Sequence, residues 1–226
     1  METIKAIKVS IVLRVILKME DCYNRVLKAA HDLFMKYGIR SVSMDDIARH
    51  LGISKKTIYS CFTEKDEIVL KVNQLMQEKW EQEADAIRDT ASNAIELMVR
   101  LSLMLRSHIS SMNPSILFDL YKFHRPAWEE WNKYKTENVR KKLMDVMDRG
   151  VQEGLFRPDI DKSILSTLRV EQIELAFNDS IFPHDTYNLE LVQMQLADHF
   201  IQGLLTEKGA EYYKQTKGKL FETKNN

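Results

Sequence analysis

Glycine and proline are scarce in this chain, and this scarcity is the feature that most constrains its fold. Only 7 Gly and 4 Pro interrupt 226 residues, whereas Leu, Lys, Glu, Met and Ala are plentiful. These abundant residues favour helices, and short strands joined by tight turns would need many more turn residues. We therefore predict an all-α fold of about nine helices, in which a three-helix head at the N-terminus precedes a larger helical body.

The overall charge carries no signal for a polyanionic partner. The chain has 33 basic and 33 acidic residues, so its formal net charge is zero. Within residues 1–70, however, twelve basic side chains stand against nine acidic ones. The N-terminal part therefore concentrates a mild excess of positive charge, and any contact with nucleic acid is expected there.

The cysteine content and the apolar stretches argue against export and against a membrane anchor. Cys22 and Cys61 are too few for a disulfide framework and have no metal-binding spacing, so we predict two small packing residues, with redox sensing as the alternative. The apolar stretch 9–17 is interrupted by Arg14 and is far short of the ~20 residues that a membrane span needs. We expect a cytoplasmic protein in a reducing compartment.

The first residues have no clear helical stripe. For residues 1–19 three structures stay open: a disordered arm, a short strand or an additional turn of helix. Met19 stands just before the first strongly patterned segment, and it is a hypothetical natural start. The role of this arm is not readable from its sequence.

Capping residues divide the segment after this arm into four helices. A helix is predicted from Asp21 to Tyr37, and Gly38 ends it. Ser43 stands three residues before Asp46, which predicts a capping box that opens a helix over 44–51. Gly52 then permits a sharp turn, Ser54 caps a third helix over 55–62, and a fourth helix is predicted over about 68–88.

The segments after residue 90 are expected to form the body. Helices are predicted over about 91–111, from Pro114 to Phe123, from Pro126 to about Gly150, over 161–178 and over 189–205. The last of these is apolar on more than one side, which indicates a partner helix. The polar tail after Gly209 is expected to be a frayed, solvated end.

The segment Ser43 to Phe62, SMDDIARHLGISKKTIYSCF, meets the requirements of a helix-turn-helix. Small Ala48 allows the two helices to approach, and Ile47, Leu51, Ile53 and Ile58 form a miniature core. The second helix can then present its polar residues to the major groove of DNA, which is ~12 Å wide.

The same segment resembles the DNA-binding head of the tetracycline-repressor (TetR) family. The resemblance covers about residues 22–80 and lies in Ala-Ala-x-x-Leu-Phe at 29–34, Ile47-Ala48, Leu51-Gly52-Ile53-Ser54-Lys55, Thr57-Ile58-Tyr59 and Phe62 with Lys65. It implies base or phosphate contacts from helix 55–62 and phosphate contacts from Thr57 and Lys65. Cys61 departs from the Tyr or His that is usual there. The expected DNA-binding residues are Ser43, Lys55, Lys56, Thr57, Tyr59, Ser60 and Lys65.

The body resembles the family more loosely, through the stretch from Gly150 to Asp159 and the terminal helix pair. The resemblance implies a homodimer formed through the last two long helices and a small hydrophobic or aromatic effector bound inside the body. The candidate pocket residues are Met98, Leu101, Leu105, Phe118, Tyr121, His124, Trp128, Trp131 and Met147.

The resulting domain prediction has four parts: an arm over 1–19, a helix-turn-helix domain over 20–80, a regulatory and dimerisation domain over 81–208, and a polar tail over 209–226. We expect a ligand-released repressor on a palindromic operator in double-stranded DNA, with no catalytic residue, no cofactor, no metal and no membrane contact. His108 and His124 lack any partner at ligand spacing. Two alternatives stay open: a DNA binder that has lost its ligand, and a helical enzyme or metabolite-binding protein with a vestigial head.

Overall fold

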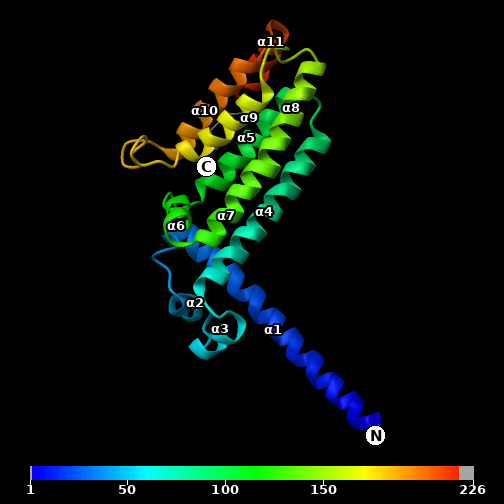
Figure 1. Ribbon diagram of the computed structural model, residues 1–226, viewed down its shortest axis with the longest axis vertical. Coiled ribbons are helices and arrows are strands. Elements are labelled where there is room, and N and C mark those ends of the chain that lie inside the picture. The colour runs from blue at the N-terminus through cyan, green and yellow to red at the C-terminus, as the bar shows by residue number, and fades with distance from the viewer. Residues whose placement is uncertain (1, 219–226) are drawn as a thin grey trace.

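The all-α prediction is confirmed. The computed structural model describes residues 2–218, with side chains from Glu20 onward, and this part of the chain contains eleven α-helices, one π-helical stretch and no extended strand. The elements are α1 (Glu2–Tyr37), α2 (Met44–Leu51), α3 (Lys55–Cys61), α4 (Lys65–Thr90), α5 (Ala94–Ser110), α6 (Ile116–Phe123), α7 (Arg125–Tyr134), η1 (Lys135–Val139), α8 (Arg140–Gln152), α9 (Lys162–Leu175), α10 (Leu189–Leu204) and α11 (Glu207–Thr216). Figure 1 shows α2 and α3 at one end of the elongated body and α11 at the other.

The described residues contain two more α-helices than the nine segments that the sequence outlined, for two reasons. The helix expected from Pro126 is divided by the π-helical stretch η1 into α7 and α8. The additional helix α11 occupies part of the expected polar tail. The apolar residues of this segment were assigned to one continuous helix, so the division at η1 was not predicted.

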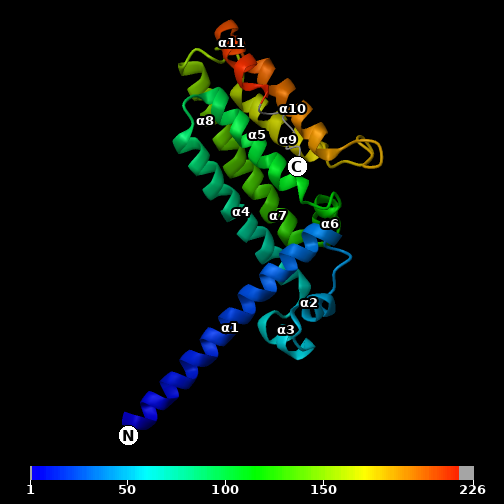
Figure 2. The ribbon, with the colours of Figure 1, turned by 180° about the vertical axis from the view of Figure 1, so that it is seen from behind.

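The first helix is much longer than predicted. It begins at Glu2 rather than near Asp21, so residues 2–19 are helical and neither a strand nor an irregular arm. Figures 1 and 2 both show this N-terminal half of α1 extending away from the other helices. The C-terminal half packs against α2, α3 and α4.

The head forms one apolar cluster with the start of α4. Phe34 of α1, Ile47 of α2, Ile58 of α3 and Ile68 of α4 are each almost completely buried in it. Four short apolar faces therefore share a single core, and α3 cannot move independently of α1 and α4.

The two cysteines are joined, which corrects the expectation of two packing residues. Cys22 of α1 and Cys61 at the end of α3 form a disulfide, with their Cα atoms 6.7 Å apart. They are 39 positions apart in sequence, and the packing of α3 on α1 brings them together. Sequence spacing alone does not contain that information.

The body is built around α5, which packs against α4, α8, α10 and α11. Ile95 and Leu97 of α5, Met147 of α8 and Ile201 of α10 are fully buried in the second apolar cluster. No helix among residues 2–218 offers an apolar stretch of the length that a lipid bilayer requires.

The two long helices expected to form the dimer differ in how much of their apolar surface is exposed. Most of the apolar residues of α10, including Met194 and Ile201, are buried within the chain itself. On α9, in contrast, Ile164 and Leu168 are 64% and 47% exposed, and they lie one turn apart. The apolar pattern of α10 thus mostly reflects burial on several sides, although Leu191 at its start is 56% exposed, and α9 exposes the longer apolar stripe.

The expected frayed tail is folded as far as the structure describes it. Tyr213 of α11 is 2% exposed, and its hydroxyl donates to Asp198 Oδ1 at 2.9 Å. Burial and this hydrogen bond both raise the pKa of the tyrosine hydroxyl. Residues 219–226, the remainder of the predicted tail, lie outside the described residues.

Candidate DNA interface and body cavity

The turn between α2 and α3 has the geometry that the sequence predicts. Ser43 accepts from the backbone N–H of Asp46, and the Asp46 carboxylate accepts from the backbone N–H of Ser43, so the capping box is confirmed. Gly52 ends α2 at φ 64°, in the left-handed region that suits glycine. Ser54 then caps α3 by accepting from the Thr57 N–H.

Helix α3 is fixed on one side and exposed on the other. Ile58 is fully buried, whereas Lys55, Lys56, Tyr59 and Ser60 are exposed. Successive exposed positions therefore form a polar face that the buried isoleucine orients outward.

The three predicted DNA-binding lysines have different surroundings. Lys55 pairs with Asp45 at 3.0 Å, and this hydrogen bond raises its pKa. Lys65 is half-buried: its Nζ donates to the carbonyl of Ile39 at 2.6 Å, and burial lowers its pKa. Lys56 has no hydrogen bond or ion pair within the described residues, so it can contact a phosphate without giving up a protein partner.

Two predicted hydroxyl contacts are partly used within the protein. Thr57 Oγ1 lies 2.8 Å from Ser54 Oγ, and Ser60 Oγ donates to the carbonyl of Thr57 at 2.7 Å. Tyr59 is 45% exposed. Ser43 is exposed but holds the capping box, so its side chain has a structural duty at the start of α2.

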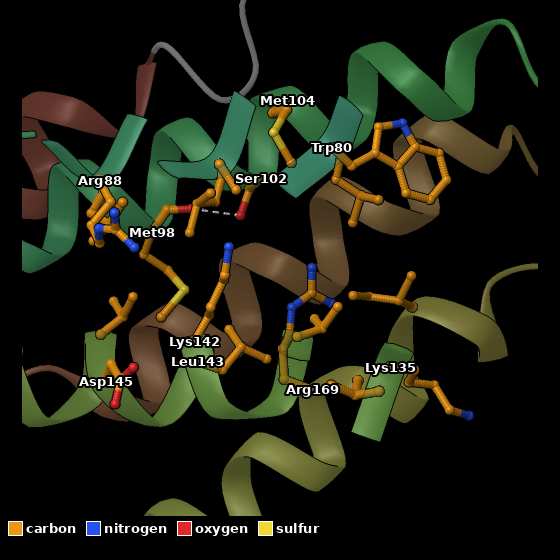
Figure 3. A pocket seen from close by; sticks show the side chains of 18 of the residues that line it. Trp80, Arg88, Met98, Ser102, Met104, Lys135, Lys142, Leu143, Asp145 and Arg169 are labelled. Carbon is orange, nitrogen blue, oxygen red and sulfur yellow. Dashed lines mark hydrogen bonds between the residues drawn. The ribbon is translucent and has the colours of Figure 1, made fainter. Parts of the chain in front are cut away.

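The body contains a cavity of about 230 Å³ between α4, α5, α7, η1, α8 and α9 (Figure 3). Four of the nine candidate pocket residues line it: Met98, Leu101, Leu105 and Trp131. Its volume is below the 300–1,000 Å³ that is typical of sites for drug-sized ligands. The cavity therefore suits a compact molecule.

The other five candidates lie outside this cavity. Met147 is fully buried in the body core, and Phe118 and Tyr121 are 54% and 63% exposed. His124 is buried at the joint between α6 and α7, and Trp128 packs against the head cluster. Residue type alone did not distinguish a cavity wall from a core or from a surface.

One wall of the cavity is aromatic. The Trp80 ring packs edge-on against Trp131 with centroids 6.2 Å apart and stacks on His108 at 5.3 Å, and Tyr134 lies 6.0 Å from Trp131. His108 Nε2 is also 2.9 Å from a carboxylate oxygen of Glu83. Burial raises the pKa of the Tyr134 hydroxyl, which keeps the ring neutral.

The cations of the cavity wall are mostly paired. Lys142 contacts Glu81 and Asp85, and Lys135 contacts Glu171 and Glu174. Arg169 differs from them. It is 4% exposed, burial lowers its pKa to about 10, and its Nη1 has no hydrogen-bond partner in the part of the chain that the structure describes.

A second cavity of about 60 Å³ links this site to the head. Phe34 and Ile39 of the head line it, and it shares Trp80, His108 and Trp131 with the larger cavity. The side chains that close the body cavity on this side thus also touch the head.

A second head-to-body link lies at the start of α4. The buried ring of His124 places its Nδ1 2.7 Å from Asp66 Oδ1. Within residues 20–218 no group of three or more His, Cys, Asp or Glu side chains is arranged to hold a metal ion.

Sequence reasoning missed Trp80, Tyr134 and Arg169. Trp80 and Tyr134 lie on helices whose apolar patterns do not distinguish the residues of a core from those of a cavity wall. Arg169 had one weak signal: no acidic residue stands three or four positions from it on α9.

The sequence of the head matches a known family. Residues 26–72 match the sequence profile described as bacterial regulatory proteins, tetR family. Over 117 residues the chain is 30% identical to the uncharacterized HTH-type transcriptional regulator YvaF of Bacillus subtilis, a match that spans 48% of this chain and 61% of that protein. Over 145 residues it is 25% identical to the HTH-type transcriptional repressor KstR2 of Mycobacterium tuberculosis, spanning 63% of this chain and 72% of the relative.

The fold also matches beyond the head. A putative transcriptional regulator from Saccharomonospora viridis, solved in complex with choline, aligns with a TM-score of 0.70 and 21% identity, over 83% of this chain and 100% of that one. At this identity the likeness establishes the shared all-α architecture. The profile match covers the capped helices described above, so residues 26–72 form a head of the tetR type of bacterial regulatory proteins, and the likeness in fold extends into the body.

Proposed function

We propose that this protein is a sequence-specific DNA-binding repressor that acts without catalysis, in the cytoplasm, as a homodimer on a palindromic operator. The observation that carries the proposal is the exposed polar face of α3, which its two caps and buried Ile58 hold outward. In a dimer, two such helices would enter successive major grooves about one helical turn (~34 Å) apart.

The surroundings of the lysines refine the roles expected in DNA binding. Lys56, which has no partner in the described part of the chain, is our first choice for a phosphate contact. Lys55 and Tyr59 share the exposed face and are proposed to read base edges, with Asp45 holding the lysine in position. Lys65 would contact phosphate only while its ammonium also donates to the Ile39 carbonyl. Its main role should therefore be to hold the turn between α1 and α2 in place.

Dimerisation is proposed through α9 and the adjoining start of α10. Ile164 and Leu168 on α9 and Leu191 on α10 expose apolar surface that a second copy of this face would cover. A symmetric dimer uses the same patch on both subunits, which suits a stripe of this kind.

We propose that the body cavity holds the effector that releases DNA. The relative from S. viridis was solved with a small molecule, choline, which supports a ligand site within this fold. Trp80 and His108 border both cavities, so a ligand that displaces them would strain the contact between body and head. A coupling of about 1–3 kcal/mol would weaken operator binding roughly 5- to 150-fold.

Selection of bound sequences from random duplex DNA tests the proposed function. The purified protein should enrich a palindrome, and its mass on that DNA should be that of a dimer. Absence of any enriched sequence, at low as well as physiological salt, would contradict the proposal and favour a vestigial head.

A pair of lysine variants tests the proposed interface. Lys56→Ala should weaken binding to operator and random DNA alike and reduce the slope of log affinity against log salt by about 1, because one phosphate contact is lost. The matched control is Lys133→Ala, which removes an exposed lysine of α7 in the body and should leave both quantities unchanged. Equal effects of the two variants would refute the assignment of α3 to the interface.

A further inference from the structure

Arg169 has a buried charge without a counterion among the side chains of residues 20–218. It belongs to α9, is 4% exposed and lines the body cavity. Figure 3 shows its guanidinium group pointing into the space that Met98 and Leu143 border. Its Nη1 has no hydrogen-bond partner, and no ion pair joins the residue to any described carboxylate.

The acidic groups nearest in sequence and space are already engaged. Glu171 and Glu174, which follow Arg169 on α9, both contact Lys135. Asp85 of the cavity wall contacts Lys142, and Asp145 is exposed, with its charge acting on Arg88.

The aromatic contact of Arg169 does not replace a counterion. Its guanidinium carbon lies 6.0 Å from the centroid of the Phe200 ring, at the outer limit of a cation–π interaction. Most of the desolvation cost of the charge is therefore unmatched in the ligand-free protein.

The other residues that line the cavity indicate which chemical groups a ligand of Arg169 would carry besides an anion. Leu97, Leu101, Met104 and Leu105 of α5 provide an apolar side, and Trp131 provides an aromatic one. A single unpaired cation in such a lining is suited to a molecule with one anionic end and an apolar remainder. A guanidinium matches the planar, two-oxygen geometry of a carboxylate better than it matches a point charge.

We infer that the effector is a compact apolar or aryl monocarboxylate, whose carboxylate pairs with Arg169 and whose apolar part occupies the cavity between α5 and Trp131. This inference rests on the proposed function, because it assigns the chemical class of ligand for the same regulatory site. The cavity volume of about 230 Å³ restricts the class to small acids.

Isothermal calorimetry with matched probes tests the charge requirement. The probes are octanoate against 1-octanol, 3-phenylpropionate against 3-phenylpropanol, and choline as a cation. Wild type should bind each acid roughly 10- to 100-fold more tightly than its alcohol, as expected for a hydrogen bond to a charged group. Binding of acid and alcohol with equal affinity, strongest binding of choline, or no binding of either acid at millimolar concentration would each overturn the inference.

Variants assign the effect to Arg169. Arg169→Met should abolish the preference for the acid, and Arg169→Lys should retain part of it because a cation is still present. The control Arg125→Met removes an exposed, ion-paired arginine outside the cavity and should bind as wild type does. A preference for the acid that survives in a folded Arg169→Met variant would overturn the inference.

A separate measurement keeps the proposed function distinguishable. Fluorescence anisotropy of ligand-free protein on its selected operator reports DNA binding, and addition of octanoate should then release the DNA from wild type but not from Arg169→Met. Failure to bind DNA without ligand would refute the proposed function and leave the calorimetry to decide the ligand class. Octanoate that binds through Arg169 without weakening operator binding would overturn the effector assignment.

Discussion

Replacing Arg169 by methionine should stabilise the ligand-free protein, because the substitution removes a buried charge that none of the described side chains neutralises. Burial lowers the pKa of Arg169 from its ordinary value to about 10, and this difference corresponds to about 3 kcal/mol against the charged form in the folded state. Since the folded pKa lies below the unfolded one, this cost is fully present below pH 10 and fades only as the pH rises above it toward the ordinary pKa of arginine.

Two effects reduce the gain expected from Arg169→Met. The variant loses the distant contact with the Phe200 ring, worth about 0.5–1 kcal/mol, and it leaves some space where the longer guanidinium stood. A net increase of about 1–3 kcal/mol in the free energy of unfolding follows, within the range seen when buried ionic groups are replaced by apolar ones. For a chain of this size each kcal/mol should raise Tm by roughly 2–4 °C.

Urea unfolding at pH 7.5, followed by circular dichroism at one fixed protein concentration, measures this change. The m values of the variant and wild type should agree, so that the shift in midpoint reports stability alone. Arg125→Met is the control, because its exposed pair with Glu129 should contribute little. If Arg169→Met were less stable than wild type by about 1 kcal/mol or more while the control was unchanged, the arginine would have a structural partner and the reasoning would be refuted.

Three further predictions concern the head and the dimer. A Cys22→Ser, Cys61→Ser double variant should lose roughly 3–4 kcal/mol, the stabilisation expected for a loop of 39 positions, and a reductant should lower the unfolding midpoint of wild type but not of the variant. Ser43→Ala should cost about 1 kcal/mol in urea unfolding because the N-cap of α2 is lost, and an unchanged midpoint would contradict the capping role. Leu168→Lys should convert the dimer to a monomer in sedimentation equilibrium while the circular dichroism spectrum is retained, and a variant that stays dimeric would exclude the exposed stripe of α9 from the interface.

The head could be predicted from sequence because its determinants are local. The capping box links Ser43 to Asp46, and Gly52 and Ser54 end one helix and begin the next. Each of these contacts spans only a few residues, so their order along the chain already fixes the helix boundaries and the sharp turn. The disulfide was missed for the opposite reason. Its two cysteines are 39 positions apart in sequence, and they come together only when α3 packs on α1.

The body was less predictable because apolar residues of the same types occur in its core, on its cavity wall and on its surface. Met147 is core, Leu101 lines the cavity, and Leu168 is surface, although all three follow the same helical spacing. The partner-helix prediction for α10 stays a prediction for a similar reason, because apolar residues on several faces also describe a helix that its own chain surrounds. Only the packing of neighbouring helices distinguishes these cases.

Arg169 shows why a functional residue of this kind is hidden in sequence. Within α9 it stands between Leu168 and Val170, and two glutamates follow within five positions, so it resembles an ordinary surface arginine. In the folded chain those glutamates contact Lys135 of η1, and the helix presents Arg169 to the cavity instead. The charge is thus left without a partner by a contact between two distant segments. A charge that is unpaired only after folding is a better indicator of a ligand than the residue type itself, because folding alone gives the protein no reason to bear its cost.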